Sequence, residues 1–353
     1  MQDNVCKQKI IFFTSALDLD NPLLAHSWNW VIEICKNVQE VECYPIHLGT
    51  VPNILPNNLT IREIGGGNPF KRIRAIKRLL VIFFSTIRDR RANTQVIYHM
   101  IKEPGLVLSP LFYVARVKQV LWYSHWIGGL VLKFVCTFVD KICTPTSNSF
   151  PLKKIKKVII TGHGIDSNIF FYDKEKAKAC NRVYSVGRVA RVKRLENVIK
   201  VAGRVPKFKK LELIGPVFDL KYFHELQELA LKNKIELVSY GAVPYSKIAK
   251  VFQESGIYFL GSPNTLDKAA VQAAMCGSLV ISEDRVALES IGMTEIWAKH
   301  LQRNEIPSLV DQLKILLELD FTKFTQLQDY ISIQSRLRHS TSNLIPQLLQ
   351  TTF

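Results

Sequence analysis

The sequence contains no apolar segment long enough to span a lipid bilayer. Its apolar stretches include LLVIFFSTI (79–87) and WIGGLVLKFVCTFV (126–139), and Lys133 interrupts the second. A membrane-spanning helix needs about 20 consecutive apolar residues. The N-terminal stretch turns acidic after a brief apolar run and has no small-residue cleavage site. We therefore expect a first β-strand there rather than a signal peptide.

Paired cysteines and acidic residues are also scarce. The seven cysteines include no CxxC pair and lie mostly in apolar segments, so we expect buried thiols in a reducing compartment, with no disulfide and no zinc. Only 30 Asp and Glu residues face 47 Lys and Arg residues, which gives a net charge of +17. Such an excess attracts nucleic acid, anionic lipid or phosphorylated substrates, and charge alone does not choose among them.

Apolar strand-like runs alternate with helix-like segments along the whole chain, which predicts α/β layers with parallel sheets. In the first half the predicted strands are Lys9–Thr14, Val41–Ile46, Leu59–Ile64, Gln95–His99, Gln119–Tyr123 and Lys141–Thr144. In the second half they are Val183–Val186, Leu211–Ile214, Ile235–Ser239, Gly256–Leu260 and Ser278–Ser282. The strand count restarts after the Gly-rich and charged segment 161–179, so we expect two doubly wound domains joined there.

Several segments of the second half occur in a recognisable order. They are VIITGHGID (158–166), VGRVARVKRLENVIKVAG (186–203), LELIGP (211–216) and VSYGAVPYSKIAKVFQESGIYFLGSPNTLDKAAVQAAMCGSLVIS (238–282). Together they resemble the family 4 glycosyltransferases of the GT-B fold. The first half resembles that family more loosely, through WYSHW (122–126), ICTPTSNSF (142–150) and RLRHSTSNLI (336–345).

The resemblance implies a GT-B architecture, in which two Rossmann-like domains face a central cleft. Residues 1–165 would form the N-terminal acceptor-binding domain, and residues 166–322 would form the domain that binds a nucleotide sugar. Residues 323–353 would be a helical segment that returns towards the first domain.

Basic residues follow the first predicted strand of the second domain. Val183–Val186 runs into Gly187 and Arg188, and Lys193 lies five residues further on. In an open parallel sheet ligands bind beyond the carboxyl ends of the strands, where guanidinium and ammonium groups can neutralise a diphosphate. In the family, the residues matching Arg188 and Lys193 contact the donor diphosphate. A solvated basic face is the alternative, because Arg191 and Arg194 lie beside them.

The donor loop departs from the family pattern. The family places two glutamates, separated by seven residues, at the positions that are Asn264 and Gln272 here. Gln272 keeps an acceptor oxygen for a ribose hydroxyl but loses the charge. A decayed site on a retained scaffold is the alternative. The residues that the resemblance assigns to donor binding are Gly187, Gly215, Val243 (in the nucleobase turn GAVPYS), Asn264, Thr265, Leu266, Asp267, Lys268 and Gln272.

One histidine of the first domain follows a buried strand. His125 lies just after Gln119–Tyr123, and the family has a histidine near the transferred sugar at the matching position. We interpret His163 as shaping the interdomain turn, and His99 as a weaker candidate for the cleft.

Two other motifs suggest metal or phosphate binding. Asp18-Leu19-Asp20 matches the metal-binding DxD of the GT-A fold, but its surroundings do not fit that fold. Gly65-Gly66-Gly67 could cradle a phosphate, and we favour an acceptor-side loop.

Positive charge is concentrated between Lys71 and Arg91. Eight basic residues and one acid, Asp89, flank the apolar segment 79–87, which suits a helix in the headgroup region of an anionic membrane. A core helix with solvated ends is the alternative. The residues we assign to a membrane contact are Arg72, Arg74, Lys77 and Arg78.

The sequence therefore predicts a glycosyltransferase that moves a sugar from a nucleoside-diphosphate sugar to a glycan or lipid-linked acceptor. We expect catalytic roles for His125, Arg188 and Lys193. The family implies retention of anomeric configuration, no obligatory metal and no cofactor beyond the donor substrate. We expect a cytoplasmic location, on the inner face of the cell membrane. A catalytically silent scaffold is the alternative, and no nucleic-acid reader motif is present.

Overall fold

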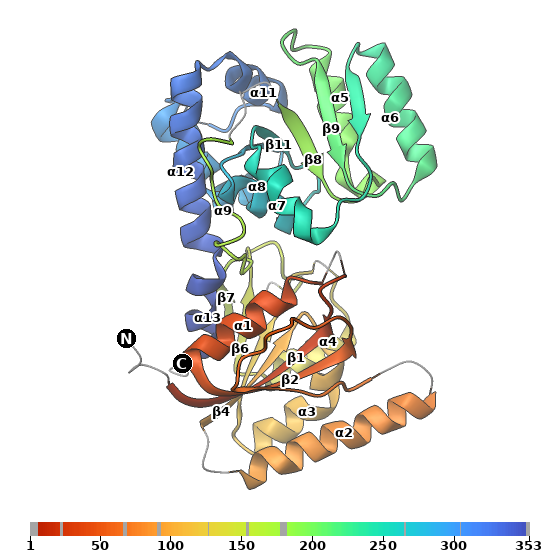
Figure 1. The fold of residues 1–353 in the computed structure, drawn as a ribbon, viewed down its shortest axis with the longest axis vertical. Coiled ribbons are helices and arrows are strands. Elements are labelled where there is room, and N and C mark those ends of the chain that lie inside the picture. The colour runs from red at the N-terminus through yellow and green to blue at the C-terminus, as the bar shows by residue number, and fades with distance from the viewer. Residues whose placement is uncertain are drawn as a thin grey trace. The chain divides into compact units, whose positions relative to one another are not determined.

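The computed structural model divides the chain into two compact units (Figure 1). Unit 1 is Met1–Gly164 with Thr341–Phe353, and unit 2 is Ile165–Ser340. The structure describes residues 6–21, 24–65, 69–89, 93–125, 127–152, 155–176, 182–264, 266–303 and 305–350. Among these residues no helix combines the length and apolar character that crossing a membrane requires.

Unit 1 is built on a parallel sheet of seven strands. In chain order the strands are β1 (Cys6–Leu17), β2 (Val38–Leu48), β3 (Leu59–Ile61), β4 (Asn93–His99), β5 (Lys118–Trp122), β6 (Lys141–Thr144) and β7 (Val158–Ile160). They lie side by side in the order β3-β2-β1-β4-β5-β6-β7. The helices are α1 (Ser27–Asn37), α2 (Pro69–Arg88), α3 (Glu103–Val114), α4 (Leu130–Phe138) and α13 (Thr341–Leu349).

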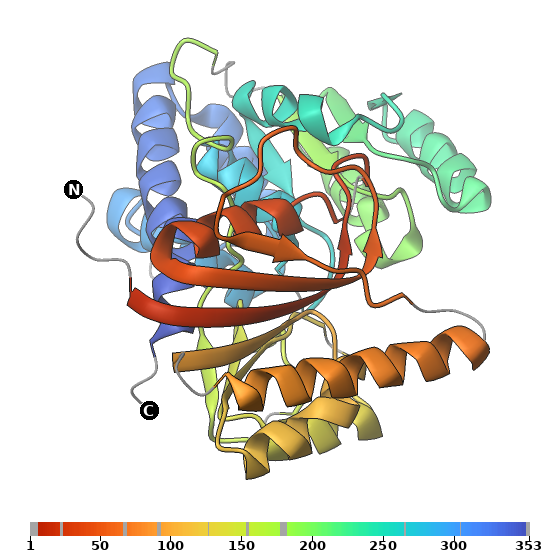
Figure 2. The same ribbon diagram turned by 60° about the horizontal axis from the view of Figure 1, so that its bottom comes forward.

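Helices cover both faces of this sheet (Figure 2). Successive side chains of a strand point to opposite faces, so Ile10 and Phe12 pack with α1 and α13, whereas Ile11 and Phe13 pack with α2, α3 and α4. All four side chains are fully buried. A sheet that is buried on both faces needs such uninterrupted apolar strands, which explains the run KIIFF in the sequence.

Unit 2 repeats the design with five parallel strands around one core. The strands are β8 (Val183–Val186), β9 (Lys210–Ile214), β10 (Glu236–Ser239), β11 (Ile257–Phe259) and β12 (Leu279–Ile281), in the order β10-β9-β8-β11-β12. The helices are α5 (Leu195–Ala202), α6 (Leu220–Lys232), α7 (Tyr245–Gln253), α8 (Lys268–Met275), α9 (Arg285–Ile291), α10 (Met293–Glu295), α11 (Leu309–Glu318) and α12 (Phe321–His339). Short helical turns cover Arg191–Lys193 and Ile296–His300.

The two doubly wound parallel sheets confirm the fold class expected from the sequence. Each of the eleven predicted strands has a counterpart, with ends that differ by a few residues. β7 is not among the predicted strands. It has only three residues and leaves Ile159 and Ile160 exposed. At the C-terminal end, α12 belongs to unit 2 and α13 to unit 1.

Candidate functional site

The strand order of unit 2 marks a place for a ligand. β8 pairs with β9 on one side and with β11 on the other. The chain adds β9 and β10 on one side of β8 and then crosses over to add β11 and β12 on its other side, so the strand order reverses at β8. Ligands of open parallel sheets bind outside the carboxyl ends of the strands at such a switch point. The two loops that leave this point are residues 187–194 after β8 and residues 260–267 after β11.

Backbone contacts fix the neighbouring loops. Gly187 and Gly215 follow β8 and β9 and have φ angles of 134° and 146°. A Cβ atom at Gly215 would lie 2.0 Å from the carbonyl oxygen of Gly187. The N–H of Gly187 donates to Ile214 at 2.8 Å, and the N–H of Gly215 donates to Gly241 at 2.7 Å. The loops after β8, β9 and β10 are therefore held together without side chains between them.

An ion pair joins the two loops at the switch point. The Nζ atom of Lys193 contacts Oδ2 of Asp267, and the hydroxyl of Ser262 donates to the same oxygen at 2.9 Å. Both charged side chains are mostly buried, with 15% and 22% of their surfaces exposed. Lys193 also lies against Gly187, because a Cβ atom there would be 3.4 Å from its Nζ atom. The structure thus places a positive charge directly beside the glycine turn.

The arginines of the same loop differ in their partners. Arg191 donates to Glu225 at 2.7 Å and lies 3.5 Å from Asp219, so its charge is used within the protein. Arg188 is exposed, and its guanidinium carbon lies 5.4 Å from the ring centroid of Phe218. Within the described part of the chain Arg188 forms no ion pair. Of these two arginines, Arg188 is the one available to an anionic ligand.

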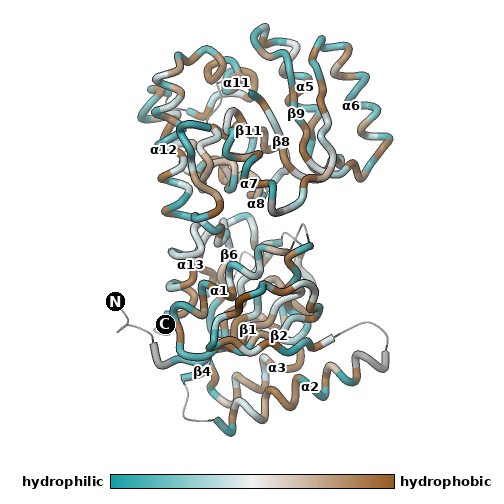
Figure 3. Tube along the Cα trace, in the orientation of Figure 1, coloured by the Kyte–Doolittle hydropathy of each residue, from teal (hydrophilic) through white to brown (hydrophobic). Residues whose placement is uncertain are grey.

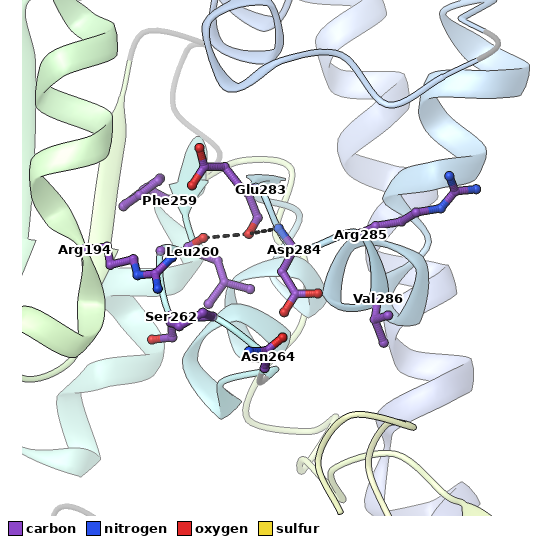
Figure 4. Close-up of a pocket in the computed structure, with 12 residues that line it drawn as sticks. Arg194, Phe259, Leu260, Ser262, Asn264, Glu283, Asp284, Arg285 and Val286 are labelled. Atoms are coloured by element: carbon purple, nitrogen blue, oxygen red, sulfur yellow. Dashed lines mark hydrogen bonds between the residues drawn. The ribbon is translucent and has the colours of Figure 1, made fainter. Parts of the chain in front are cut away.

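A cavity of about 290 Å³ adjoins the switch point (Figure 4). The residues that line it come from the end of β11, from the loops after β8, β11 and β12 and from the start of α9. They are Arg194, Phe259, Leu260, Gly261, Ser262, Pro263, Asn264, Ser282, Glu283, Asp284, Arg285 and Val286.

The acidic side chains of this cavity form hydrogen bonds within the protein. Asp284 accepts from the N–H of Ala287 at 3.1 Å and so caps α9, while Glu283 accepts from Asn197 at 3.0 Å. The hydroxyl of Ser282 joins the neighbouring loops, as the dashed lines in Figure 4 show. Asn264, which has a φ angle of 54°, lies with Arg194 on the wall of the cavity.

The first turn of α8 carries the other polar residues of the predicted donor loop. Lys268 is half-buried, and burial of its ammonium group lowers its pKa to about 7. Gln272 is 9% exposed and lies one turn further along the same side of the helix. Among the described residues no protein group hydrogen-bonds the Gln272 amide. A neutral amide therefore stands at position 272, where the resemblance predicts a carboxylate, and the ionisable Lys268 lies one turn before it.

The remaining donor-loop predictions have different outcomes. Leu266 is 2% exposed and belongs to the unit 2 core, so only its backbone could meet a ligand. Val243 is half-buried between β10 and α7 and packs against the same core. Thr265 lies outside the described residues. Their roles in donor binding stay predictions.

The histidines of unit 1 have distinct environments. His125 is exposed three residues beyond β5, and its Nδ1 atom accepts from the N–H of Ile127 at 3.0 Å. Its catalytic role stays a prediction. His99 is 1% exposed, 4.4 Å from the Trp30 ring and 3.2 Å from the Thr14 hydroxyl. It is a core residue, so our interpretation of His99 as a cleft candidate is wrong. His163 is also buried.

The possible metal motif of unit 1 stabilises a loop. The Asp18 carboxylate accepts from the N–H groups of Asp20 and Thr50 at 3.1 and 3.0 Å, and Asp20 accepts from the Thr50 hydroxyl at 2.6 Å. In the described ranges no three His, Cys, Asp or Glu side chains form a group suited to a metal ion. In the triple-glycine segment, positions 66 and 67 lie outside those ranges.

Comparison with known proteins finds similar structures but no similar sequence family. No protein-family model and no curated protein matches the sequence. The structure is similar to Anabaena Alr3699/HepE, solved in complex with UDP and glucose, with a TM-score of 0.67 and 13% identity over 97% of this chain and 98% of that chain. It is also similar to sucrose-phosphate synthase from Thermosynechococcus elongatus, with a TM-score of 0.65 and 10% identity over 97% of each chain.

A third similar structure is WaaG, a glycosyltransferase involved in lipopolysaccharide biosynthesis. Its TM-score is 0.57, and the two chains are 10% identical over 96% of this chain and 98% of that chain. These neighbours have the GT-B fold, and the fold predicted from the sequence is confirmed. Assignment to family 4 stays a prediction.

The close approach of the glycine loops yields a first prediction. Gly215→Ala should lower the free energy of unfolding by more than Gly241→Ala, because both positions have a positive φ but only the first new Cβ would meet backbone atoms. The strained conformation alone costs about 1–2 kcal/mol, and the contact at Gly215 adds to it. Urea denaturation followed by circular dichroism measures the difference. Equal losses would show that the loops after β8 and β9 can separate freely.

Proposed function

We propose that the protein is a glycosyltransferase whose unit 2 binds a nucleoside-diphosphate sugar. The observation that carries this proposal is the position of Arg188 and Lys193 at the switch point of a GT-B sheet. Two cations beside a glycine turn suit a diphosphate, which carries the negative charge of the leaving group. HepE has been solved with UDP and with UDP-glucose, so uridine nucleotides are the first donors to test.

Donor binding would require Lys193 to change partners. In the structure its ammonium group is neutralised by Asp267, whereas Arg188 makes no ion pair among the described residues. We propose that Arg188 receives the diphosphate first and that Lys193 then turns from Asp267 towards it. Stabilising the departing diphosphate lowers the barrier to breaking the bond between sugar and phosphate. This chemistry is consistent with the retaining, metal-independent mechanism that the resemblance implies.

The start of α8 would hold the rest of the donor. We propose that the amide oxygen of Gln272 accepts from a ribose hydroxyl and that Lys268 lies near the phosphates. Lys268 is the first residue of α8, and the positive end of a helix dipole favours an anion. Asn264 would contact the donor from the adjoining cavity wall.

Unit 1 would then bind the acceptor substrate. We propose a glycan or lipid-linked acceptor at the cytoplasmic face of the membrane, with His125 next to the transferred sugar. The net charge of +17 supports an anionic acceptor or surface. The exposure of His125 just beyond β5 supports its access to a substrate.

A catalytically silent scaffold is the second candidate. Two observations favour it, namely the replacement of both family glutamates by Asn264 and Gln272 and the neutralisation of Lys193 by Asp267. Thermal denaturation with a panel of nucleotides separates the two candidates. Stabilisation by one nucleoside diphosphate supports the enzyme, and stabilisation by none supports the scaffold.

The phosphate-binding assignment can be tested by three substitutions. Arg188→Ala and Lys193→Ala should each weaken nucleoside-diphosphate binding about tenfold or more, because a charge-assisted contact contributes about 1.5–3 kcal/mol. Arg191→Ala is the matched control, since its charge is already paired with Glu225 and Asp219. Isothermal titration calorimetry measures all three affinities. If all three variants lose the same affinity, the loop is only a basic surface.

Gln272 offers a test of whether the altered loop still works. Gln272→Ala should weaken donor binding several-fold, because the ribose loses an acceptor worth on the order of 1 kcal/mol. Gln272→Glu should bind equally well or more tightly, since a carboxylate is the stronger acceptor. Competition with a fluorescent nucleotide compares the three proteins. If neither change affects binding, position 272 does not contact the donor.

Lys268 predicts a pH-dependent signature of binding. Its pKa of about 7 leaves it mostly neutral at pH 8, and a nearby diphosphate should raise that pKa and favour the charged form. Nucleoside-diphosphate binding at pH 8 should therefore take up close to one proton. Calorimetry in two buffers of different ionisation enthalpy measures this uptake, and Lys268→Met should abolish it. If the binding enthalpy is the same in both buffers, no proton is taken up and Lys268 does not lie near the bound phosphates.

A further inference from the structure

Unit 1 exposes large apolar side chains on three neighbouring helices. On α2 these are Val81, Phe84 and Ile73, which are 67%, 61% and 55% exposed. Val114 on α3 and Leu130 on α4 are 81% and 86% exposed. Figure 3 shows hydrophobic stretches along α2 and α3. We call the exposed sides of α2, α3 and α4 the outer helical face.

α2 is apolar on two opposite sides. Leu79 and Ile82 are buried against the sheet. At about 100° per residue, Ile73 and Phe84 point about 160–180° away from Ile82. A helix that only covers a core carries polar residues on its outer side. The second apolar side of α2 is therefore not explained by the packing of unit 1.

Cations lie among the exposed apolar residues of α2. Arg74, Lys77 and Arg88 are exposed, and the helix contains no acidic residue. Arg78 holds the segment after β3, because its Nη1 atom donates to the carbonyl oxygens of Glu63 and Ile64 at 2.9 and 2.6 Å. Arg78 is nevertheless exposed, and our assignment of it to a membrane contact stays a prediction. The side chain of Arg72 lies outside the described set.

The apolar surface continues onto the next two helices. α3 packs against α2 through Phe112 and Phe83, whose ring centroids are 5.5 Å apart, and against α4 through Tyr113 and Phe138, at 5.8 Å. A shallow hollow of about 480 Å³ lies between α3 and α4. Its lining residues are Leu106, Leu130, Val131, Lys133, Phe134 and Thr137. The hollow thus repeats the combination of apolar side chains with a cation.

We propose that the outer helical face docks on an anionic lipid bilayer. Its apolar side chains would enter the boundary between headgroups and acyl chains, and Arg74, Lys77 and Arg88 would meet the lipid phosphates. The same charges disfavour a second copy of this chain as the occupant, because two basic faces repel each other. A nucleic acid would use the cations but leave Phe84 and Leu130 without a partner. The proposal does not depend on glycosyl transfer.

The experiment is flotation of the full-length protein with lipid vesicles. Vesicles of phosphatidylcholine alone are compared with vesicles that also contain phosphatidylglycerol, at low and high salt. We expect binding to the anionic vesicles only, with release as salt rises. Arg74→Glu combined with Lys77→Glu should reduce binding more than tenfold, since each cation near the surface contributes about fivefold. Phe84→Ser combined with Val81→Ser should also reduce it.

Matched controls lie on α6 of unit 2. Leu231→Ser and Lys232→Glu replace an exposed apolar residue and an exposed cation there, and vesicle binding should not change. Nucleotide binding by every variant reports unit 2 separately, so loss of docking is distinguishable from loss of the proposed function. Circular dichroism confirms that the variants are folded.

Three results would overturn the proposal. They are equal binding to neutral vesicles, no binding to either kind, and unchanged binding by the two double variants. Analytical ultracentrifugation of the protein without lipid tests whether a second copy of this chain occupies the face instead. If it is a dimer that Phe84→Ser dissociates, the face is an interface between copies of this chain.

Discussion

The ion pair between Lys193 and Asp267 is the interaction on which the candidate site depends. It joins the loops after β8 and β11 across the switch point, where both side chains are mostly buried. A buried ammonium without a partner would be costly, so Asp267 makes the position of Lys193 possible in the ligand-free protein. The carboxylate also competes with any anion that approaches. Loop structure and anion binding are therefore linked through a single ammonium group.

The altered positions of the donor loop can be understood together. A glutamate at position 272 would stand one turn from Lys268 and would favour its charged form. With the neutral Gln272 that contribution is missing, and burial lowers the pKa of Lys268 to about 7. Under the proposed function, a donor diphosphate would bring a further negative charge close to Lys268. The proposed function therefore does not require the glutamates that the resemblance predicts at positions 264 and 272.

The sequence predicts the sheets well and the side-chain partners poorly. Strands such as Ile10–Phe13 are apolar on both faces, which a periodicity analysis detects, whereas β7 is short and exposed. Lys193 and Asp267 are 74 residues apart, so nothing local pairs them. The different partners of Arg188 and Arg191 also arise only when α6 packs beside their loop. The resemblance points to Arg188 and Lys193 from the sequence alone. Only the structure shows that Arg191 is paired within the protein whereas Arg188 is exposed.

The outer helical face shows the limit of reading hydrophobicity from sequence. An apolar residue in a helix is normally assigned to a core. In the structure Leu79, Ile82 and Phe112 already fill the space against the sheet, so the core is complete without Phe84 and Leu130. Exposed apolar side chains contribute little to folding, and in water they promote aggregation. The proposed bilayer contact would cover these apolar side chains and place lipid phosphates beside the exposed Arg74, Lys77 and Arg88.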